Sequence, residues 1–291
     1  MAAQDNSIPI EAWNTVLFEK FCRFRYVLTH GLSAHSECVF ARTPYPAGAR
    51  VLDVGCGFGD TTLRIAEQVG PKGRAVGVDC AARFIESARQ GVSDKDRLQT
   101  SFFVVDVEYD QLNGPYESVF SRFGTMFFNR PGAALRNVRK ALVAGGEFTM
   151  IVWRRREDNP WIYEAEALVK DIVPVVRPED SNQVHCGPGP FSMADADTVS
   201  AMLRASGFDR ISFERYDTPI CIGQTVNEAV EFAMSLGPAG EMIRLAGAEG
   251  AKRKPQVMES LSRLMTERQR ADGIWMDSSS WIVSARNPTP I

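Results

Sequence analysis

Three aspartates stand at the ends of short apolar runs that are typical of buried strands: Asp53, Asp79 and Asp106. The first run leads into a turn with glycine on alternate positions, at residues 55, 57 and 59. A strand, a glycine turn and the start of a helix form a site for a nucleotide-like ligand. Carboxylates accept hydrogen bonds from hydroxyl and amino groups and attract cations. The predicted ligand therefore carries such groups.

The spacing of the glycines separates the candidate ligands. Dinucleotide sites use G-x-G-x-x-G, whereas here Gly59 comes one position early and gives G-x-G-x-G. Asp60 then stands where a pyrophosphate would need bare backbone, and its carboxylate would repel a phosphate. Asp53 likewise suits a cationic group. S-adenosylmethionine meets these conditions, because it combines an ammonium, a sulfonium, a ribose and an adenine without any phosphate.

Two stretches resemble a known family. The sequence LDVGCGFGD, which ends at Asp60, resembles the first motif of class I S-adenosylmethionine-dependent methyltransferases. The sequence SRFGTMFF, which begins at Ser121, is similar to a segment of a small-molecule branch of that family, often named only methyltransferase type 11. The resemblance covers residues 46–155 closely and 195–290 in outline, and it implies S-adenosylmethionine as the cofactor.

The resemblance implies a role for each residue of the cofactor site. The glycines would let the backbone approach the cofactor, Asp53 would face its ammonium directly or through water, and Asp79 would accept from both ribose hydroxyls. Asp106 would accept from the adenine amino group, and Cys80 would offer small size at the turn. Arg122 could pair with the cofactor carboxylate in a bidentate fork. The predicted cofactor-binding set is Asp53, Gly55, Gly57, Gly59, Asp79, Cys80, Asp106, Val107, Ser121, Arg122 and Phe123.

The elements that must position these residues alternate between strand and helix. We expect strands at 50–54, 74–79, 101–107, 116–121, 147–153, 211–221 and 280–286. Helices are expected at 61–69, 81–90 and from residue 129 to a stop at Gly145-Gly146, and also at 160–173 and 195–206. Residues 226–271 predict two helices separated by the 247–250 region. This alternation predicts an α/β fold with a Rossmann-like, doubly wound sheet. The family resemblance implies seven strands, with the last one antiparallel.

The methyl acceptor would meet segments outside the common core. Residues 1–45 predict an N-terminal helical lid, and residues 46–291 a methyltransferase domain with helical insertions at about 156–194 and 225–275. Aromatic residues of these segments, Trp13, Phe24 and Trp161, are candidates for an apolar acceptor pocket.

A general base is hard to identify from the sequence. A sulfonium carries its own leaving group, so transfer needs mainly in-line positioning and exclusion of water, and a base only where the acceptor must lose a proton. The weak candidates are His30, His35, His185 and Tyr26. Because each histidine lies outside the common core, we expect it more often to be an exposed or hydrogen-bonded residue than a base.

Composition excludes several classes of function. The chain has 291 residues and a net charge of −3, which does not favour binding to nucleic acid or to an anionic membrane. No apolar run approaches the ~20 residues of a membrane span, and no secretory signal is evident. The six cysteines show no metal-binding spacing. We therefore expect a cytoplasmic protein without a metal, while a homodimer is left open.

The sequence thus predicts methyl transfer to a small, partly apolar metabolite by in-line SN2 displacement. O-methylation is favoured, with N- or C-methylation open. One alternative is a non-catalytic regulatory or partner subunit that binds S-adenosylmethionine. A second alternative, an NAD-dependent oxidoreductase, is disfavoured by Asp60 and Asp106.

Overall fold

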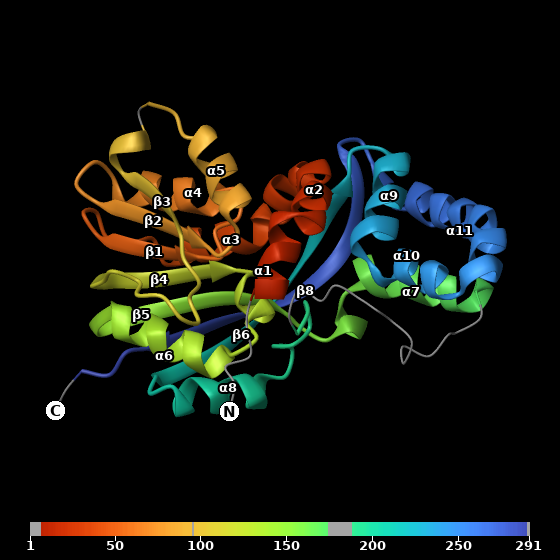
Figure 1. Ribbon diagram of the computed structural model, residues 1–291. Coiled ribbons are helices and arrows are strands. Elements are labelled where there is room, and N and C mark those ends of the chain that lie inside the picture. The colour runs from red at the N-terminus through yellow and green to blue at the C-terminus, as the bar shows by residue number, and fades with distance from the viewer. Residues whose placement is uncertain (1–6, 95, 174–187, 290–291) are drawn as a thin grey trace.

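The computed structural model describes residues 7–94, 96–173 and 188–289, and its arrangement is shown in Figure 1. The helices are α1 Ser7–Asn14, α2 Val16–Arg23, α3 Ser33–Arg42, α4 Asp60–Val69, α5 Ala82–Gln90, α6 Pro131–Ala141, α7 Pro160–Ile172, α8 Ala196–Ala205, α9 Val226–Leu236, α10 Pro238–Leu245 and α11 Gly247–Glu267, with a π-helix at Val27–Gly31. The strands are β1 Arg50–Val54, β2 Arg74–Asp79, β3 Thr100–Val104, β4 Tyr116–Arg122, β5 Leu142–Trp153, β6 Asp209–Gly223, β7 Gln269–Arg270 and β8 Gly273–Arg286.

The strands form one sheet in the order β3-β2-β1-β4-β5-β8-β6. Strands β1 to β5 run parallel, while β8 lies antiparallel between β5 and β6. The short β7 pairs only with the start of β8. The predicted doubly wound α/β sheet with an antiparallel last strand is therefore confirmed. Because the order reverses beside β1, the carboxyl ends of β1 and β4 flank the point at which such sheets bind ligands.

The central strands of the sheet are buried on both faces, which explains why they read as continuous apolar runs. On one face Leu52 and Val54 of β1 join the larger core cluster with α6 and α8. On the other face Val51 packs with α3 and α4 in a second cluster. These helices each pack an apolar side against one face of the sheet. The two core clusters thereby hold the strands, and the residues at their carboxyl ends, in place.

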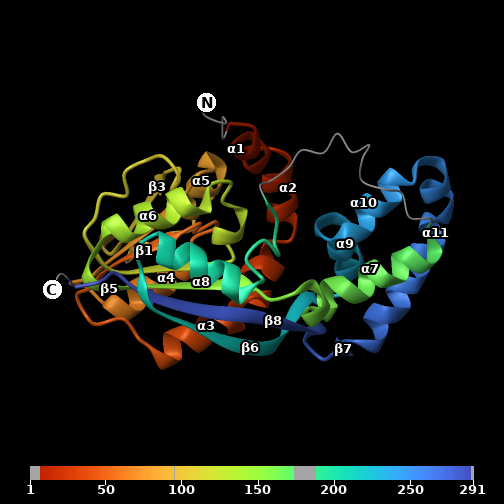
Figure 2. The same ribbon diagram turned by 90° about the horizontal axis from the view of Figure 1, so that it is seen from below.

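Two long strands carry the additions to this core. In Figure 1, β6 and β8 extend away from the other strands to a group formed by α7, α9, α10 and α11. Helices α1 and α2 lie between that group and the core, and Figure 2 shows the same separation from below.

Several expected boundaries were wrong. The strand expected at 101–107 ends at Val104, and those expected at 147–153 and 280–286 begin earlier, at Leu142 and Gly273. Residues 247–250 do not separate two helices, because α11 begins at Gly247; the chain instead breaks at Gly237, and Pro238 opens the separate helix α10. Proline is well suited to a first helical position. Gly145-Gly146 does not end a helix either, because these glycines lie inside β5. Gly145 there donates to Asn287 O at 2.8 Å, and Asn287 donates to Gly146 O at 2.9 Å.

Candidate functional site

A cavity opens where the carboxyl ends of the parallel strands meet the N-terminal helices. It encloses about 1120 Å³ including its open mouth. Its walls come from the glycine turn after β1, the residues after β2, β3 and β4, and the first turns of α4 and α5, closed over by α1, α2 and the π-helix. The volume accommodates a nucleoside-sized ligand beside a second small molecule.

The glycine turn has the backbone shape that the sequence predicts. Gly55, Gly57 and Gly59 have φ of 68°, 52° and 82°, a region that glycine enters without steric cost. A Cβ on Gly55 would lie 3.1 Å from Cα of Gly124, and a Cβ on Gly59 would lie 2.8 Å from the ring of Phe102. Gly55 and Gly57 line the cavity, whereas Gly59 completes the turn without lining the cavity.

Asp79 lines the cavity at the end of β2 with both oxygens fixed by backbone. Its Oδ2 accepts from Gly57 N at 3.1 Å, and its Oδ1 accepts from Ala81 N at 2.9 Å. Burial raises the pKa of this carboxyl, and the two N–H groups oppose that rise. Cys80 also lines the cavity, and burial followed by the charge of Asp79 raises the pKa of its thiol well above the usual range. The thiol therefore stays protonated, which fits a spacer better than a nucleophile.

Asp106 and Val107 line the cavity beyond the end of β3, together with Glu108. Oδ1 of Asp106 accepts from Glu108 N at 3.0 Å. The Glu108 carboxylate accepts from the backbone N–H of Asn129 at 2.7 Å and of Arg130 at 2.8 Å, immediately before α6. Burial raises the pKa of Glu108. These contacts hold the loop after β3 against the segment that follows β4.

Asp53 lies beneath the glycine turn, outside the residues that line the cavity. Its Oδ2 accepts from the hydroxyls of Thr61 at 2.7 Å and Thr62 at 2.6 Å. Its Oδ1 is buried and has no hydrogen-bond partner in the described part of the chain. Burial raises the pKa of this carboxyl to about 6. Asp53 therefore anchors the first turn of α4, and its predicted role toward the ligand ammonium, directly or through water, stays a prediction.

Arg122 is paired within the protein, whereas the sequence predicted that it would meet the cofactor carboxylate. Its Nη2 donates to Oδ2 of Asp60 at 2.7 Å and to the carbonyl of Leu28 at 3.3 Å, and its Nη1 donates to Oγ of Ser36 at 3.2 Å. The side chain is only 9% exposed, yet it borders the cavity. Arg122 thus joins the end of β4 to the start of α4 and to two N-terminal elements.

The neighbours of Arg122 have different roles. Ser121 is fully buried, and its Oγ donates to Val54 O at 2.8 Å, so it fixes β4 to β1 outside the cavity wall. Phe123 lines the cavity with φ of 57°, an uncommon conformation for a bulky residue. It stacks on Trp153 at 3.9 Å between ring centroids. Such strain is found where surrounding structure enforces it, often at functional sites.

The candidate bases that the structure describes, His30, His35 and Tyr26, do not line this cavity. His35 is fully buried, and its ring nitrogens lie 2.9 Å from the hydroxyls of Ser280 and Ser278. Burial, followed by the charge of Arg122, lowers the pKa of His35 to about 3, so it remains neutral and structural. His30 is exposed and packs on the ring of Tyr26 at 4.9 Å. His185 lies outside the described residues.

Of the three aromatic residues predicted to form the acceptor pocket, one lines the cavity and two do not. Trp13 lines the cavity, packed edge-on against Phe21 and Phe127 at 5.2 and 5.1 Å. Phe24 is instead buried in the core against Phe232. Trp161 is partly buried and packs on the core beside Trp153 and Phe232.

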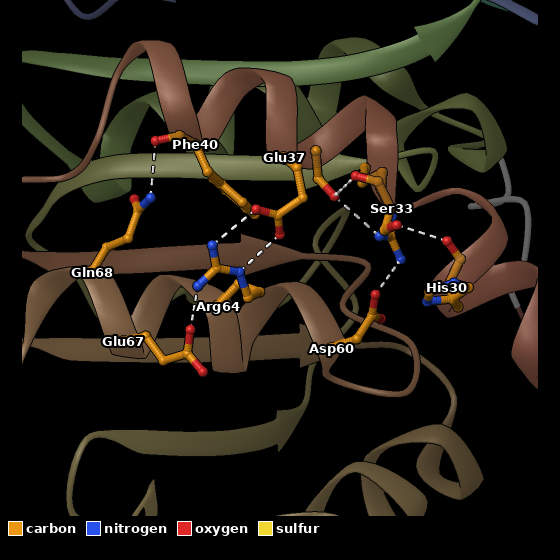
Figure 3. A network of polar contacts seen from close by, with 10 residues as sticks. His30, Ser33, Glu37, Phe40, Asp60, Arg64, Glu67 and Gln68 are labelled. Atoms are coloured by element: carbon orange, nitrogen blue, oxygen red, sulfur yellow. Dashed lines mark hydrogen bonds and ion pairs between the residues drawn. The ribbon is translucent and has the colours of Figure 1, made fainter. Parts of the chain in front are cut away.

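Helix α3 is fixed to the core, so only part of the predicted 1–45 lid covers the cavity. Figure 3 shows Arg64 of α4 bonded to Glu37 and Glu67, and Gln68 donating to the Phe40 carbonyl. The cavity wall comes instead from α1, α2 and the π-helix, which supply the lining residues that the sequence analysis missed: Ile10, Leu28, Thr29 and Leu32. A π-helix gives no sequence signal of its own, although such segments are frequent at functional sites.

Comparisons with known proteins agree with this geometry. Residues 51–146 match the family described as "Methyltransferase domain". The chain is 24% identical over 174 residues to a ubiquinone/menaquinone biosynthesis C-methyltransferase of Pseudomonas aeruginosa, which covers 57% of this chain and 68% of the relative. It is 36% identical over 81 residues to an aklanonic acid methyltransferase of a Streptomyces species, which covers 25% of this chain and 37% of that protein.

Solved structures share the fold. A putative methyltransferase from Bacillus halodurans aligns with a TM-score of 0.55 at 15% identity, covering 88% of this chain and all of that one. A Haemonchus contortus phosphoethanolamine N-methyltransferase in complex with S-adenosylmethionine aligns with a TM-score of 0.58 at 13% identity, covering 97% of this chain and 60% of that one. Among the described residues, no helix is long and apolar enough to cross a membrane, and no cluster of metal-ligating side chains occurs.

Proposed function

The chain is a class I S-adenosylmethionine-dependent methyltransferase, and we propose that it methylates a small, mainly apolar acceptor through a hydroxyl that ionises without help from a protein base. S-adenosylmethionine, when bound, supplies a methyl group on a sulfonium whose departure needs no proton. The tasks left to the chain are to hold the cofactor, to align the acceptor and to exclude water.

The cofactor residues are proposed from their positions around the cavity. Asp79, held by Gly57 N and Ala81 N, keeps acceptor capacity on both oxygens for the two ribose hydroxyls. Asp106 and Val107 lie on the loop after β3, where an adenine would stack beside α5. The glycine turn and Arg122 surround the methionine end, where the cofactor carboxylate would compete with Asp60 for the guanidinium.

The observation that carries the proposal is the state of the carboxylates in the cavity. Asp60 is bonded to Arg122, while Asp79, Asp106 and Glu108 accept from backbone N–H groups. No histidine of the described residues lines the cavity. A group that would take a proton in the transition state must be within hydrogen-bond reach and free to bind that proton. The acceptor therefore has to arrive nucleophilic, as an acidic phenol, enol or carboxylic acid does.

The walls of the cavity fit such an acceptor. Trp13, Phe21, Phe84 and Phe127 form an apolar aromatic surface. A planar, weakly polar molecule would bury its faces there, while its oxygen points at the methyl group. In that step the acceptor oxygen donates an electron pair to the methyl carbon. The bond between this carbon and sulfur breaks, and its electron pair stays on sulfur.

Carbon is the second candidate for the acceptor atom. The similarity to a protein named as a C-methyltransferase of ubiquinone/menaquinone biosynthesis favours it. A phenolate or enolate is nucleophilic at oxygen and at the conjugated carbon, so both candidates share one class of acceptor and differ in its orientation.

Two experiments test the proposal. S-adenosylmethionine and S-adenosylhomocysteine should each raise the melting temperature, because a ligand that binds only the folded state stabilises it. A shift with NAD but not with these compounds would reject the cofactor assignment. Methyl-labelled S-adenosylmethionine is then incubated with matched sets of phenols, enols, carboxylic acids and amines, and the products are examined by NMR for new O–CH₃ or C–CH₃ groups. Labelling of the amines alone would refute the acceptor class.

A further inference from the structure

A second cavity lies on the opposite side of the loop after β3. It encloses about 870 Å³ including its open mouth, and its floor is the face of β2 and β3 that carries Val76, Val78 and Phe103. The loop of residues 105–115 forms one wall, where a crossover helix would otherwise cover the sheet. Val105 lines both cavities, so the two share a wall without sharing a site.

Two guanidinium groups stand at one end of this second cavity. Arg50 and Arg74 are direct neighbours in the parallel register of β1 and β2, and both line the cavity. Arg74 donates to the carbonyl of Leu98 at 2.8 Å, and Arg50 lies 5.1 Å from the ring centre of Tyr116. Neither makes an ion pair with a carboxylate in the part of the chain that the structure describes. Like charges placed side by side on neighbouring strands are unfavourable. An anion between them would relieve that repulsion.

Apolar side chains form most of the remaining cavity wall, beside the polar residues Ser101, Gln111 and Asn113. Phe103 lies on the floor and is 50% exposed, with Val105 and Leu112 as further apolar lining. Ligand pockets commonly combine an apolar wall of this kind with a few polar groups.

We infer that this cavity binds a small amphipathic anion: a carboxylate at Arg50 and Arg74, with an aliphatic or aromatic tail along Val76, Val78 and Phe103. The volume selects a small molecule rather than a protein segment, and the paired guanidinium groups select an anionic head. Ser101 and Asn113, which also line the cavity, supply further polar groups. The site is distinct from the cofactor cavity and requires no methyl transfer.

Isothermal titration with decanoate, below the concentration at which it forms micelles, tests this site. The full chain is first saturated with S-adenosylhomocysteine, so that the probe cannot enter the neighbouring cavity. One decanoate should bind per chain, and the paired variant Arg50→Gln/Arg74→Gln should weaken it at least tenfold, since a charge-assisted contact contributes about 1.5–3 kcal/mol. Decanol and decyltrimethylammonium should bind at least tenfold more weakly than decanoate.

A matched variant controls for general effects. Arg97→Gln removes an exposed arginine from the neighbouring 3₁₀ turn outside the cavity and should leave decanoate binding unchanged. Equal binding by the paired arginine variant, or by the cationic probe, would overturn the inference. The inference would also be overturned if the natural chain bound no decanoate and formed a dimer that Phe103→Asp dissociates. The surface would then be an interface between two copies of the chain.

Discussion

Replacement of Asp53 by asparagine tests the energetic cost of the buried carboxylate beneath the glycine turn. The side chain is 1% exposed, and Oδ1 has no hydrogen-bond partner among the described residues. Burial raises its pKa from 3.8 to about 6, although the hydroxyls of Thr62 and Thr61 oppose that rise. Asparagine has the same shape, and its amide oxygen can still accept from both threonines. The substitution therefore removes mainly the charge.

The magnitude follows from the pKa. An acid whose pKa is higher in the folded state than in the unfolded state binds its proton more tightly in the folded state. The folded state is therefore relatively more stable at a pH below the unfolded pKa, and this stability is lost as the pH rises through the folded pKa. For Asp53 the window runs from pH 3.8 to about 6, and the free energy of unfolding should lose about 3 kcal/mol across it. Asp53→Asn abolishes this loss. The variant should gain about 3 kcal/mol relative to the natural chain between pH 4 and 7.5, and nothing further above that.

Urea denaturation of the ligand-free protein at several pH values measures this difference. The control is Asp94→Asn, whose carboxylate is 96% exposed and should produce no comparable trend. A stability difference that does not vary between pH 4 and 7.5 would refute the reasoning, because the buried carboxylate would then carry no charge penalty.

Three other perturbations probe the site. Asp79→Ala should raise the Kd of S-adenosylhomocysteine about a hundredfold, since two hydrogen bonds to a charged group are lost, whereas unchanged affinity in titration calorimetry would exclude Asp79. Arg122→Gln should raise the KM for S-adenosylmethionine and speed proteolysis within residues 7–31, because the link from Asp60 to the N-terminal segment is cut; normal proteolysis would contradict that link. Trp13→Ala should raise the KM of the acceptor while leaving cofactor affinity unchanged, and equal effects on both would place Trp13 elsewhere.

Features that depend on local pattern could be predicted from the amino-acid sequence. The alternation of apolar runs and helical periods specified the doubly wound sheet, because strand and helix periods are set by backbone geometry. The positive-φ turn was legible for the same reason, since only glycine adopts it freely at Gly55, Gly57 and Gly59. The aspartates at strand ends were predicted to converge, and Asp79 and Asp106 do line one cavity.

Tertiary structure alone decided which partners those residues meet. Arg122 borders the cavity as expected, but its bonds to Asp60 and the Leu28 carbonyl, which lie far from it in sequence, could not be predicted. His35 was a candidate base until packing buried it between Ser278 and Ser280 of β8. Burial and pairing arise from segments distant in the chain, and no local pattern records them. The sequence therefore identifies the methyl donor, while the surfaces that would select an acceptor or a second ligand emerge only when the sheet and its helices are assembled.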